Sequence, residues 1–138
     1  MIRRPPRSTL ERSSAASDVY KRQVQTTVGH ALAVLTSSRA YLKEAVHNLW
    51  SEAASDGSVT LDRRLALRLA ATHCIRVAVG VVETLYNAAG TSAIYEGSLI
   101  QRHFQDLHVM SQHQQARQVA YQLAGKHRLG LEIETLRF

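Results

Sequence analysis

The segment LDRRLALRLAATHCIRVAVGVVETLYNA, residues 61–88, decides the fold of this chain. Its apolar residues lie on most sides of an α-helix, as expected of a helix at the centre of a bundle or in a subunit contact. The roughly 18 uninterrupted apolar residues of a membrane span are not reached, because the most apolar part, residues 65–86, is interrupted by Arg68, His73, Arg76 and Glu83. The segment therefore predicts a buried helix of a soluble all-α domain.

Helical periods continue outward on both sides, and no stretch from Val24 onward alternates as a β-strand does. A helix is predicted from about Gln25 to Ala54 by apolar residues three and four apart, namely Val28, Ala31, Leu32, Leu35, Leu42, Ala45, Val46 and Leu49. Two shorter helices are predicted over about 99–113 and 115–128. Their apolar faces are Ile100, Phe104, Leu107 and Met110 or Ser111 in the first, and Ala116, Val119, Ala120, Leu123 and Ala124 in the second. Four helices with short connections predict an up-down four-helix bundle.

Composition limits the possible classes of protein. A chain of 138 residues, 45% hydrophobic, is enough for one domain. Its single cysteine, Cys74, cannot form an internal disulfide, so a reducing compartment such as the cytoplasm is expected. The net charge of +6 comes mainly from residues 1–23, and the other basic residues are scattered among acidic ones without interleaved aromatic residues. Neither nucleic acid nor a membrane is therefore expected as a partner.

Residues 1–23 differ in character from the rest of the chain. Pro5-Pro6, several Ser and Thr residues and the lack of an apolar period predict a disordered N-terminal arm. An arginine-rich, serine-rich and acid-poor segment is also the profile of an organelle transit peptide. In addition, residues 2–10 and 13–23 resemble conceptual translations of short-read sequencing adapters. On that interpretation the arm is an artefact without a selected function, and the real protein extends upstream of Val24.

The seven histidines raise the question of a metal site, which their spacing argues against. His103, His108 and His113 are five residues apart and so fan around a helix, and neither HExxH nor CxxC occurs. His73, on the central helix, is interpreted as a hydrogen-bonded core histidine rather than a ligand. No metal is therefore expected.

A more specific pattern joins Arg102, Asp106 and His113, which fall within one broad stripe of the third helix. Arg102 and Asp106, four residues apart, can form an ion pair. The simpler interpretation is a surface pair beside an unrelated histidine. The alternative is that the pair orients the helix so that His113 projects into a cleft, where its imidazole can hold or move a proton near neutral pH.

The loop AAGTSAIYEGS, residues 88–98, is the other candidate site. Gly90 and Gly97 permit close approach of the backbone, and the small residues leave room for a flat ligand. Glu96 is a lone carboxylate in this loop. By itself it is either an acid of a surface loop or a catalytic base.

The stretch from Ala88 to His113, followed by Tyr121 and residues 123–125, resembles the C-terminal helical domain of the acyl-CoA dehydrogenase superfamily of flavoproteins. In its dehydrogenases a Tyr-Glu-Gly-Thr-x-x-Ile-Gln-Arg motif supplies the base that removes a substrate proton. Residues 95–97 and 100–102 match the two ends of this motif, and Glu96 corresponds to the base. This sequence has one residue fewer between the two ends than the motif has.

The resemblance is greatest to the branch of two-component flavin-dependent monooxygenases. In that branch an Arg-Asp-x-His-x-x-x-x-His run ends in a histidine that faces the flavin. Asp106, His108 and His113 match this run, with Gln105 in place of the arginine. The resemblance implies that His113 serves as proton acceptor for the substrate or as a hydrogen-bond partner of the flavin.

The family fold implied is an N-terminal helical domain, a middle β-barrel and a C-terminal four-helix bundle. Residues 24–138 correspond to the bundle, so the chain is expected to be a fragment of a larger flavoprotein and inactive alone. The loop and the third helix would form one wall of the cleft that holds FAD or FMN. By resemblance, the cofactor-binding residues are Gly90, Thr91, Tyr95, Arg102 and Asp106.

Three functions remain open at this point. The resemblance favours a flavin-dependent monooxygenase of a small organic substrate, assembled as a homotetramer through its helical domain and served by a separate flavin reductase. A true acyl-CoA dehydrogenase, with an acyl-CoA substrate and Glu96 as base, is the alternative. A non-catalytic helical oligomerisation module is the third.

Overall fold

The structure, a computed structural model, describes residues 9–133, with side chains from residue 17 onward. In chain order its elements are α1 (Thr9–Asp56), α2 (Leu61–Ala89), the 3-10 helix η1 (Gly90–Ala93), α3 (Leu99–Ser111), the 3-10 helix η2 (Gln114–Ala116) and α4 (Val119–Arg128). This part of the chain contains no strand, and the predicted all-α class with four α-helices is confirmed.

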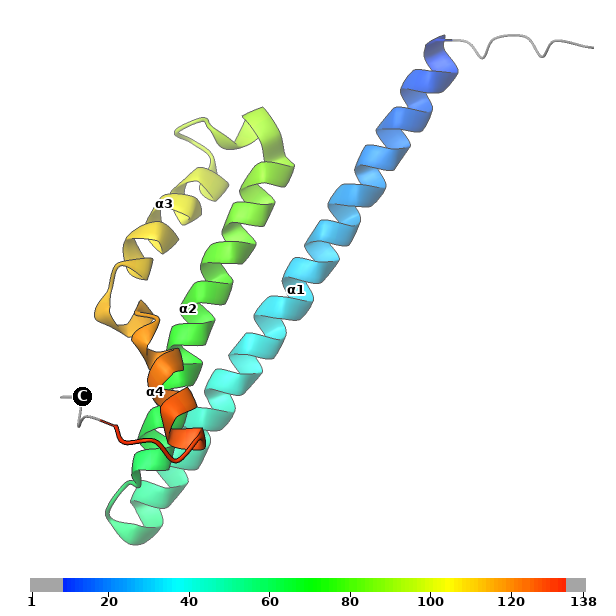
Figure 1. Cartoon of the computed structure of the whole chain (residues 1–138). Helices are drawn as coiled ribbons and strands as arrows, with labels where there is room; N and C mark the ends of the chain where they lie inside the picture. The colour runs from blue at the N-terminus through cyan, green and yellow to red at the C-terminus, as the bar shows by residue number, and fades with distance from the viewer. Residues whose placement is uncertain (1–8, 134–138) are drawn as a thin grey trace, which may run out of the picture.

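The helices are arranged around α2 (Figure 1). α1 and α2 form a long antiparallel hairpin, which is the most extensive helix contact. α3 runs beside the C-terminal half of α2 and α4 lies beside its N-terminal half, so the two short helices follow one another along the hairpin. Because α2 contacts every other α-helix, its sequence is apolar on most sides.

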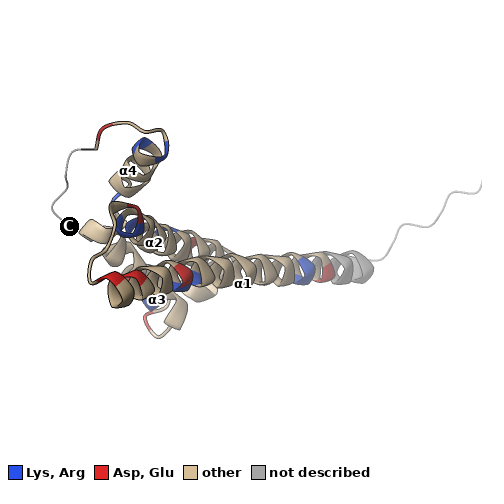
Figure 2. Ribbon diagram, turned by 90° about the horizontal axis from the view of Figure 1, so that it is seen from below, with Lys and Arg blue, Asp and Glu red and all other residues tan. Residues whose placement is uncertain are grey.

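Within the described residues, Leu61–Ala93 is the one helical stretch that is long and apolar enough, by length and composition, to cross a membrane. Its polar residues bind other parts of this chain. Arg68 and Arg76 donate hydrogen bonds to backbone carbonyls of η2, and Glu83 accepts one from α3. Basic and acidic residues both occur along α1 and α3, whereas the charged residues of α4 are basic (Figure 2).

α1 begins at Thr9, whereas the apolar pattern predicts a start near Gln25. The predicted disordered arm over residues 1–23 is therefore corrected for residues 9–23, which are helical, while residues 1–8 lie outside the described part. No proline follows Pro6, and Leu, Glu, Arg, Ala, Lys and Gln, which favour helices, are frequent in this segment. The sequencing-adapter origin of the segment stays a prediction.

Tyr20 connects this N-terminal part of α1 to the C-terminal end of α2. Its hydroxyl donates to the Ala88 carbonyl at 2.9 Å, in an exposed position. The variant Tyr20→Phe keeps the ring and removes the bond, so the expected loss in free energy of unfolding is about 0.5 kcal/mol. Urea unfolding followed by circular dichroism measures it. A loss above about 2 kcal/mol, beyond the usual value of one hydrogen bond, would contradict this expectation and mean that Tyr20 stabilises the fold by more than this one bond.

The interface between α1 and α2 has small residues at its centre. Ala31, Ser38 and Ala45 are buried at intervals of seven residues, a spacing that returns to nearly the same side of a helix. From α2, the Cys74 thiol donates to the Ser38 carbonyl at 3.0 Å. We call these three buried residues of α1 the small-residue seam. Small side chains at a helix contact let the two axes approach closely.

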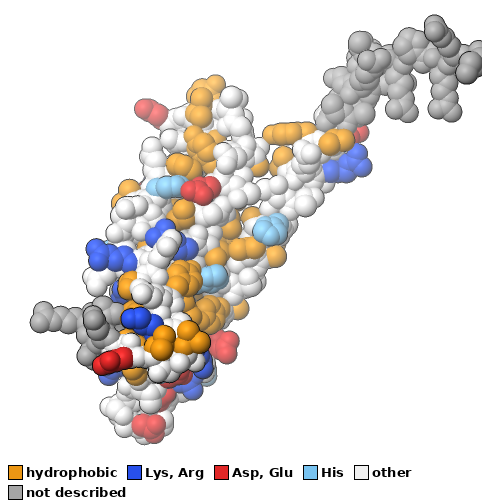
Figure 3. All heavy atoms as spheres, in the orientation of Figure 1, with side chains coloured by type: hydrophobic (Ala, Val, Ile, Leu, Met, Phe, Trp, Pro, Cys, Tyr) orange, Lys and Arg blue, Asp and Glu red, His pale blue; other side chains and the backbone are white. Residues whose placement is uncertain are grey.

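The predicted apolar stripe of α1 is only partly buried. Ala31 and Ala45 lie in the seam, but four larger members are exposed: Val28, Leu32, Leu35 and Val46. Trp50, 72% exposed, adds to the apolar surface of α1. Close packing at the seam turns the small residues inward and leaves the larger ones outside. Apolar side chains are visible at the surface in Figure 3.

Glu52 closes the turn between α1 and α2. Its carboxylate accepts the Thr60 backbone N–H at 2.6 Å and the Arg63 Nε–H at 3.0 Å. Gly57, in the same turn, has a φ of +67°, which glycine adopts without strain. The turn thus aligns the two long helices through one carboxylate.

These bonds lower the pKa of Glu52 from its ordinary value of 4.5, and the Thr60 backbone N–H is the largest cause. The ionised group therefore stabilises the fold above the ordinary pKa, and this stabilisation is lost as the pH falls through the lowered value. The variant Glu52→Gln is expected to have a lower Tm than the wild type at pH 7, with the two values converging at acidic pH. Thermal unfolding at several pH values tests this, with Glu44→Gln as an exposed control on α1. A Tm difference independent of pH would contradict it.

Candidate functional site

The loop between α2 and α3 is buried at one residue and exposed at most of the others. α2 ends at Ala89, and its C-cap Gly90 has a φ of +58° and a backbone N–H that donates to the Asn87 carbonyl. Ala93 is fully buried, whereas Thr91 is exposed. Of the two glycines predicted to allow close backbone approach, only Gly90 has a positive φ, and Gly97 does not.

Glu96 and Arg102 lie together at the start of α3. With Ile94, Gln101 and Gln105 they line a shallow pocket of about 290 Å³. The Oε1 atom of Gln101 is buried and has no hydrogen-bond partner among the described residues. A buried acceptor without a donor costs stability.

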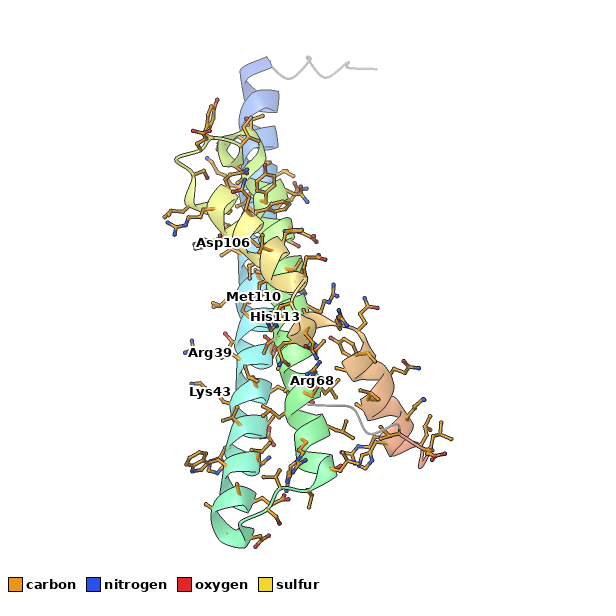
Figure 4. The ribbon with its side chains drawn as sticks, turned by 90° about the vertical axis from the view of Figure 1, so that its left-hand side faces the viewer. Arg39, Lys43, Arg68, Asp106, Met110 and His113 are labelled. Atoms are coloured by element: carbon orange, nitrogen blue, oxygen red, sulfur yellow. The ribbon has the colours of Figure 1, made fainter. Side chains whose placement is uncertain are left out.

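Arg102 and Asp106 form the predicted ion pair, with 3.8 Å between Nε and Oδ2. Both side chains are largely exposed, and such a pair is worth a few tenths of a kcal/mol. Asp106, Met110 and His113 follow one another down α3 and its C-terminal end (Figure 4). For the pair itself the simpler interpretation, a surface contact, is sufficient, and its role toward a cofactor stays a prediction.

His108, the middle member of the matched run, attaches α3 to α2. Its Nε2 lies 3.0 Å from Glu83 Oε1 and its Nδ1 lies 2.8 Å from the Phe104 carbonyl oxygen, both within hydrogen-bond distance. The ring also stacks on Phe104, which stacks on Tyr86. The structure therefore gives His108 a packing role between the two helices.

His113 lies just beyond the C-terminal end of α3, as the N-cap residue of η2. It is exposed, and its Nδ1 accepts the Gln115 backbone N–H at 3.3 Å. The 13 residues of α3, at 1.5 Å each, separate it from Glu96 by roughly 20 Å. Within the described part of the chain, the two predicted catalytic residues are therefore too far apart to act on one substrate atom.

Three donors of α2 hold the turn that follows His113, and the sequence gives little sign of them. Arg68 Nη2, Thr72 Oγ1 and Arg76 Nε donate to the carbonyls of residues 114, 115 and 116 at 3.1, 2.6 and 2.9 Å. In the sequence the two arginines are only interruptions of an apolar helix. Their spacing of four residues, which places all three on one stripe, is the signal that could have indicated a shared partner.

Two further histidines, His73 and His127, make contacts with other helices in the described part of the chain. The Tyr121 hydroxyl lies 3.5 Å from His73 Nδ1 and the Tyr41 ring meets the His73 ring edge-on, but His73 is half-buried and not in the core. His127 Nε2 donates to Asp62 Oδ1 at 3.2 Å and so ties α4 to α2. Among the residues that the structure describes, no three His, Cys, Asp or Glu side chains are placed to bind a metal ion.

The described residues form an all-α helical domain, and comparison with known proteins shows its family. Residues 7–118 match the family described as acyl-CoA dehydrogenase, C-terminal domain. Because the match covers more than half of the chain, the chain belongs to this family.

The relatives that it resembles are monooxygenases or hydroxylases by name. Indole-3-acetate monooxygenase of Pseudomonas putida is 35% identical over 101 residues, which are 73% of this chain and 26% of that protein. Indole-3-acetate monooxygenase of Acinetobacter baumannii is 27% identical over 120 residues, or 86% and 31% of the two chains. The crystal structure of 3-HSA hydroxylase from Rhodococcus sp. RHA1 shares the fold, with a TM-score of 0.78, 19% identity, and coverage of 89% of this chain and 33% of that one. The chain thus spans about a quarter to a third of these proteins.

Proposed function

We propose that the chain is the C-terminal helical domain of a flavin-dependent monooxygenase that acts on a small organic molecule. The observation that carries the proposal is the 35% identity over 101 residues with indole-3-acetate monooxygenase of Pseudomonas putida. That relative is about four times as long as the matched segment, since the match covers 26% of it. The remaining domains would therefore complete the active site.

The loop and α3 fit one wall of a flavin site. Ile94, Tyr95 and Leu99 expose apolar surface toward whatever covers this end of the domain. The residues that would hold the cofactor are Gly90, Thr91, Tyr95, Arg102 and Asp106. FAD or FMN, when bound, would supply the redox chemistry.

The side chains of this domain would orient the reactants and exclude water. Exposed in this chain, the His113 imidazole can hold a proton or donate a hydrogen bond to a bound group near neutral pH. His108 and Glu83 keep the C-terminal half of α3 on α2, so that His113 stays at the end of a fixed helix.

Two alternatives are each favoured by one observation. Glu96 shares a pocket with Arg102, which would suit a dehydrogenase base acting on an acyl-CoA. The exposed apolar residues of α1, which end in Trp50, would suit a helical oligomerisation module. The same face supports assembly of the monooxygenase as a homotetramer, with a separate flavin reductase as its second component. The cytoplasm is the proposed location, and we propose neither nucleic acid nor a membrane as a partner.

The test uses the complete reading frame that contains residues 24–138, recovered from the source genome and expressed as one protein. A monooxygenase is expected to bind flavin and, with a reductase, to insert one oxygen atom of O₂ into an aromatic or other small organic substrate. Product analysis by mass spectrometry with ¹⁸O₂ measures this. An oxidised acyl-CoA without oxygen insertion would support the dehydrogenase, and a protein that binds no flavin would support the oligomerisation module.

A further inference from the structure

We infer that Arg68, Thr72 and Arg76 are positioning residues that fix His113 as a hydrogen-bond donor through Nε2. Their effect on the side chain of His113 is a property of this chain. Its consequence for catalysis rests on the proposed function.

The three donors converge on a short piece of backbone. They are spaced by four residues, so successive Cα atoms rise about 6 Å along α2. Their acceptors are the carbonyls of three consecutive residues, 114–116, which span a shorter distance. The central donor, Thr72, has a short side chain and is 0% exposed, whereas the outer two are long arginines that reach inward. The short central side chain and the two longer outer ones can therefore all reach the three carbonyls of this short turn.

The three side-chain bonds bind the carbonyl groups of η2. The N–H groups of Gln115 and Ala116 point the other way along the chain, toward His113. Ala116, also 0% exposed, anchors the turn against the rest of the domain. Its backbone N–H donates to the His113 carbonyl at 2.9 Å, and the Gln115 N–H donates to His113 Nδ1 at 3.3 Å. Gln115 therefore makes both bonds: its carbonyl accepts from Thr72, and its N–H donates to the His113 imidazole.

The direction of that bond determines the tautomer of the neutral ring. A backbone N–H can only donate, so Nδ1 must present its lone pair to Gln115. The neutral imidazole then carries its proton on Nε2. An Nε2–H group donates a hydrogen bond and cannot accept a proton. Of the two roles that the family resemblance implies for His113, the geometry thus points to the hydrogen-bond partner and not to the proton acceptor.

The test measures the imidazole nitrogens of the ¹⁵N-labelled chain by NMR, at a pH where His113 is neutral. The wild type is expected to show the Nε2–H tautomer as the main form. Thr72→Val removes the central donor, and we expect a mixture of tautomers and roughly two- to tenfold faster hydrogen exchange at the Gln115 and Ala116 amides, as for the loss of one hydrogen bond. Thr72→Ser, which keeps the hydroxyl, is expected to retain the wild-type values.

A matched control is available on the same helix. The Thr84 hydroxyl donates to the Gly80 carbonyl of its own helix at 2.7 Å, so Thr84→Val removes a threonine hydroxyl from α2 without affecting η2. It should leave His113 unchanged. If Thr72→Val prevents folding, Arg76→Met removes an outer donor and should shift the tautomer in the same direction.

Two results would overturn the inference: a wild-type His113 with its proton on Nδ1, or a folded Thr72→Val or Arg76→Met chain with wild-type tautomer and exchange rates. Neither readout involves flavin or substrate. If the complete enzyme proves not to be a monooxygenase, the tautomer and exchange results remain valid. If the tautomer results contradict the inference, the monooxygenase proposal is still tested separately by flavin binding and oxygen insertion.

Discussion

Replacing His113 with alanine in the complete enzyme is expected to lower turnover by roughly 10²- to 10³-fold, the range seen when one positioned donor to a reacting group is removed. Flavin binding should change little, because the imidazole is exposed at the end of α3 and its hydrogen bond within the described residues is the local one from the Gln115 backbone N–H of η2. Product formation with a saturating supply of reduced flavin measures the effect.

Glu96→Gln is the matched comparison for this variant. Glu96 lies at the opposite end of α3, roughly 20 Å from His113. If the enzyme is a monooxygenase, this variant is expected to keep turnover within about tenfold of the wild type, since it lacks contact with the reacting atoms. Loss of turnover in Glu96→Gln alone would identify the dehydrogenase alternative as correct.

Leu65→Ala is expected to lower the free energy of unfolding by about 2–5 kcal/mol, the cost of removing a buried leucine side chain and leaving a cavity. Leu65 is only 3% exposed. It lies where α1, α2 and α4 meet, beside Tyr41, Leu69 and Ala124. The truncation therefore weakens the packing of α2 against both α1 and α4. Chemical denaturation of the chain, followed by circular dichroism, measures the loss.

Leu61→Ala is the control, because it makes the same change one helical turn earlier on α2. Leu61 is 42% exposed, so its truncation is expected to cost less than about 1 kcal/mol. Equal losses in the two variants would mean that the junction of the three helices is not part of the stabilising core.

Helix positions could be predicted closely wherever apolar spacing and turn residues agreed. The central helix was expected over residues 61–88 and spans Leu61–Ala89. The start of α1 was missed because residues 9–23 lack an apolar period and yet favour a helix by composition. The buried side of α1 was also misjudged. The seam uses Ser38, a residue that a search for hydrophobic side chains passes over, and it leaves Leu32 and Leu35 exposed.

The candidate site was predictable only in its residue types. Arg102 and Asp106 could be paired because both lie on one helix at a known spacing. The bond between His108 and Glu83 joins residues 25 positions apart and depends on the register of α3 against α2, which no local pattern encodes. The bonds of Thr72 end on a backbone carbonyl, and a carbonyl has no residue identity that a sequence could reveal.

The small-residue seam also limits how the length of this hairpin can change during evolution. Inserting one residue between Ala31 and Ala45 would rotate the downstream part of α1 by about 100°, and bulky side chains would then replace the small ones against α2. Seven inserted or deleted residues would nearly restore the contact. Homologous genes that differ in the length of this hairpin are therefore expected to differ by about 7, 11 or 18 codons, the insertions that return a helix to within about 20° of the same side.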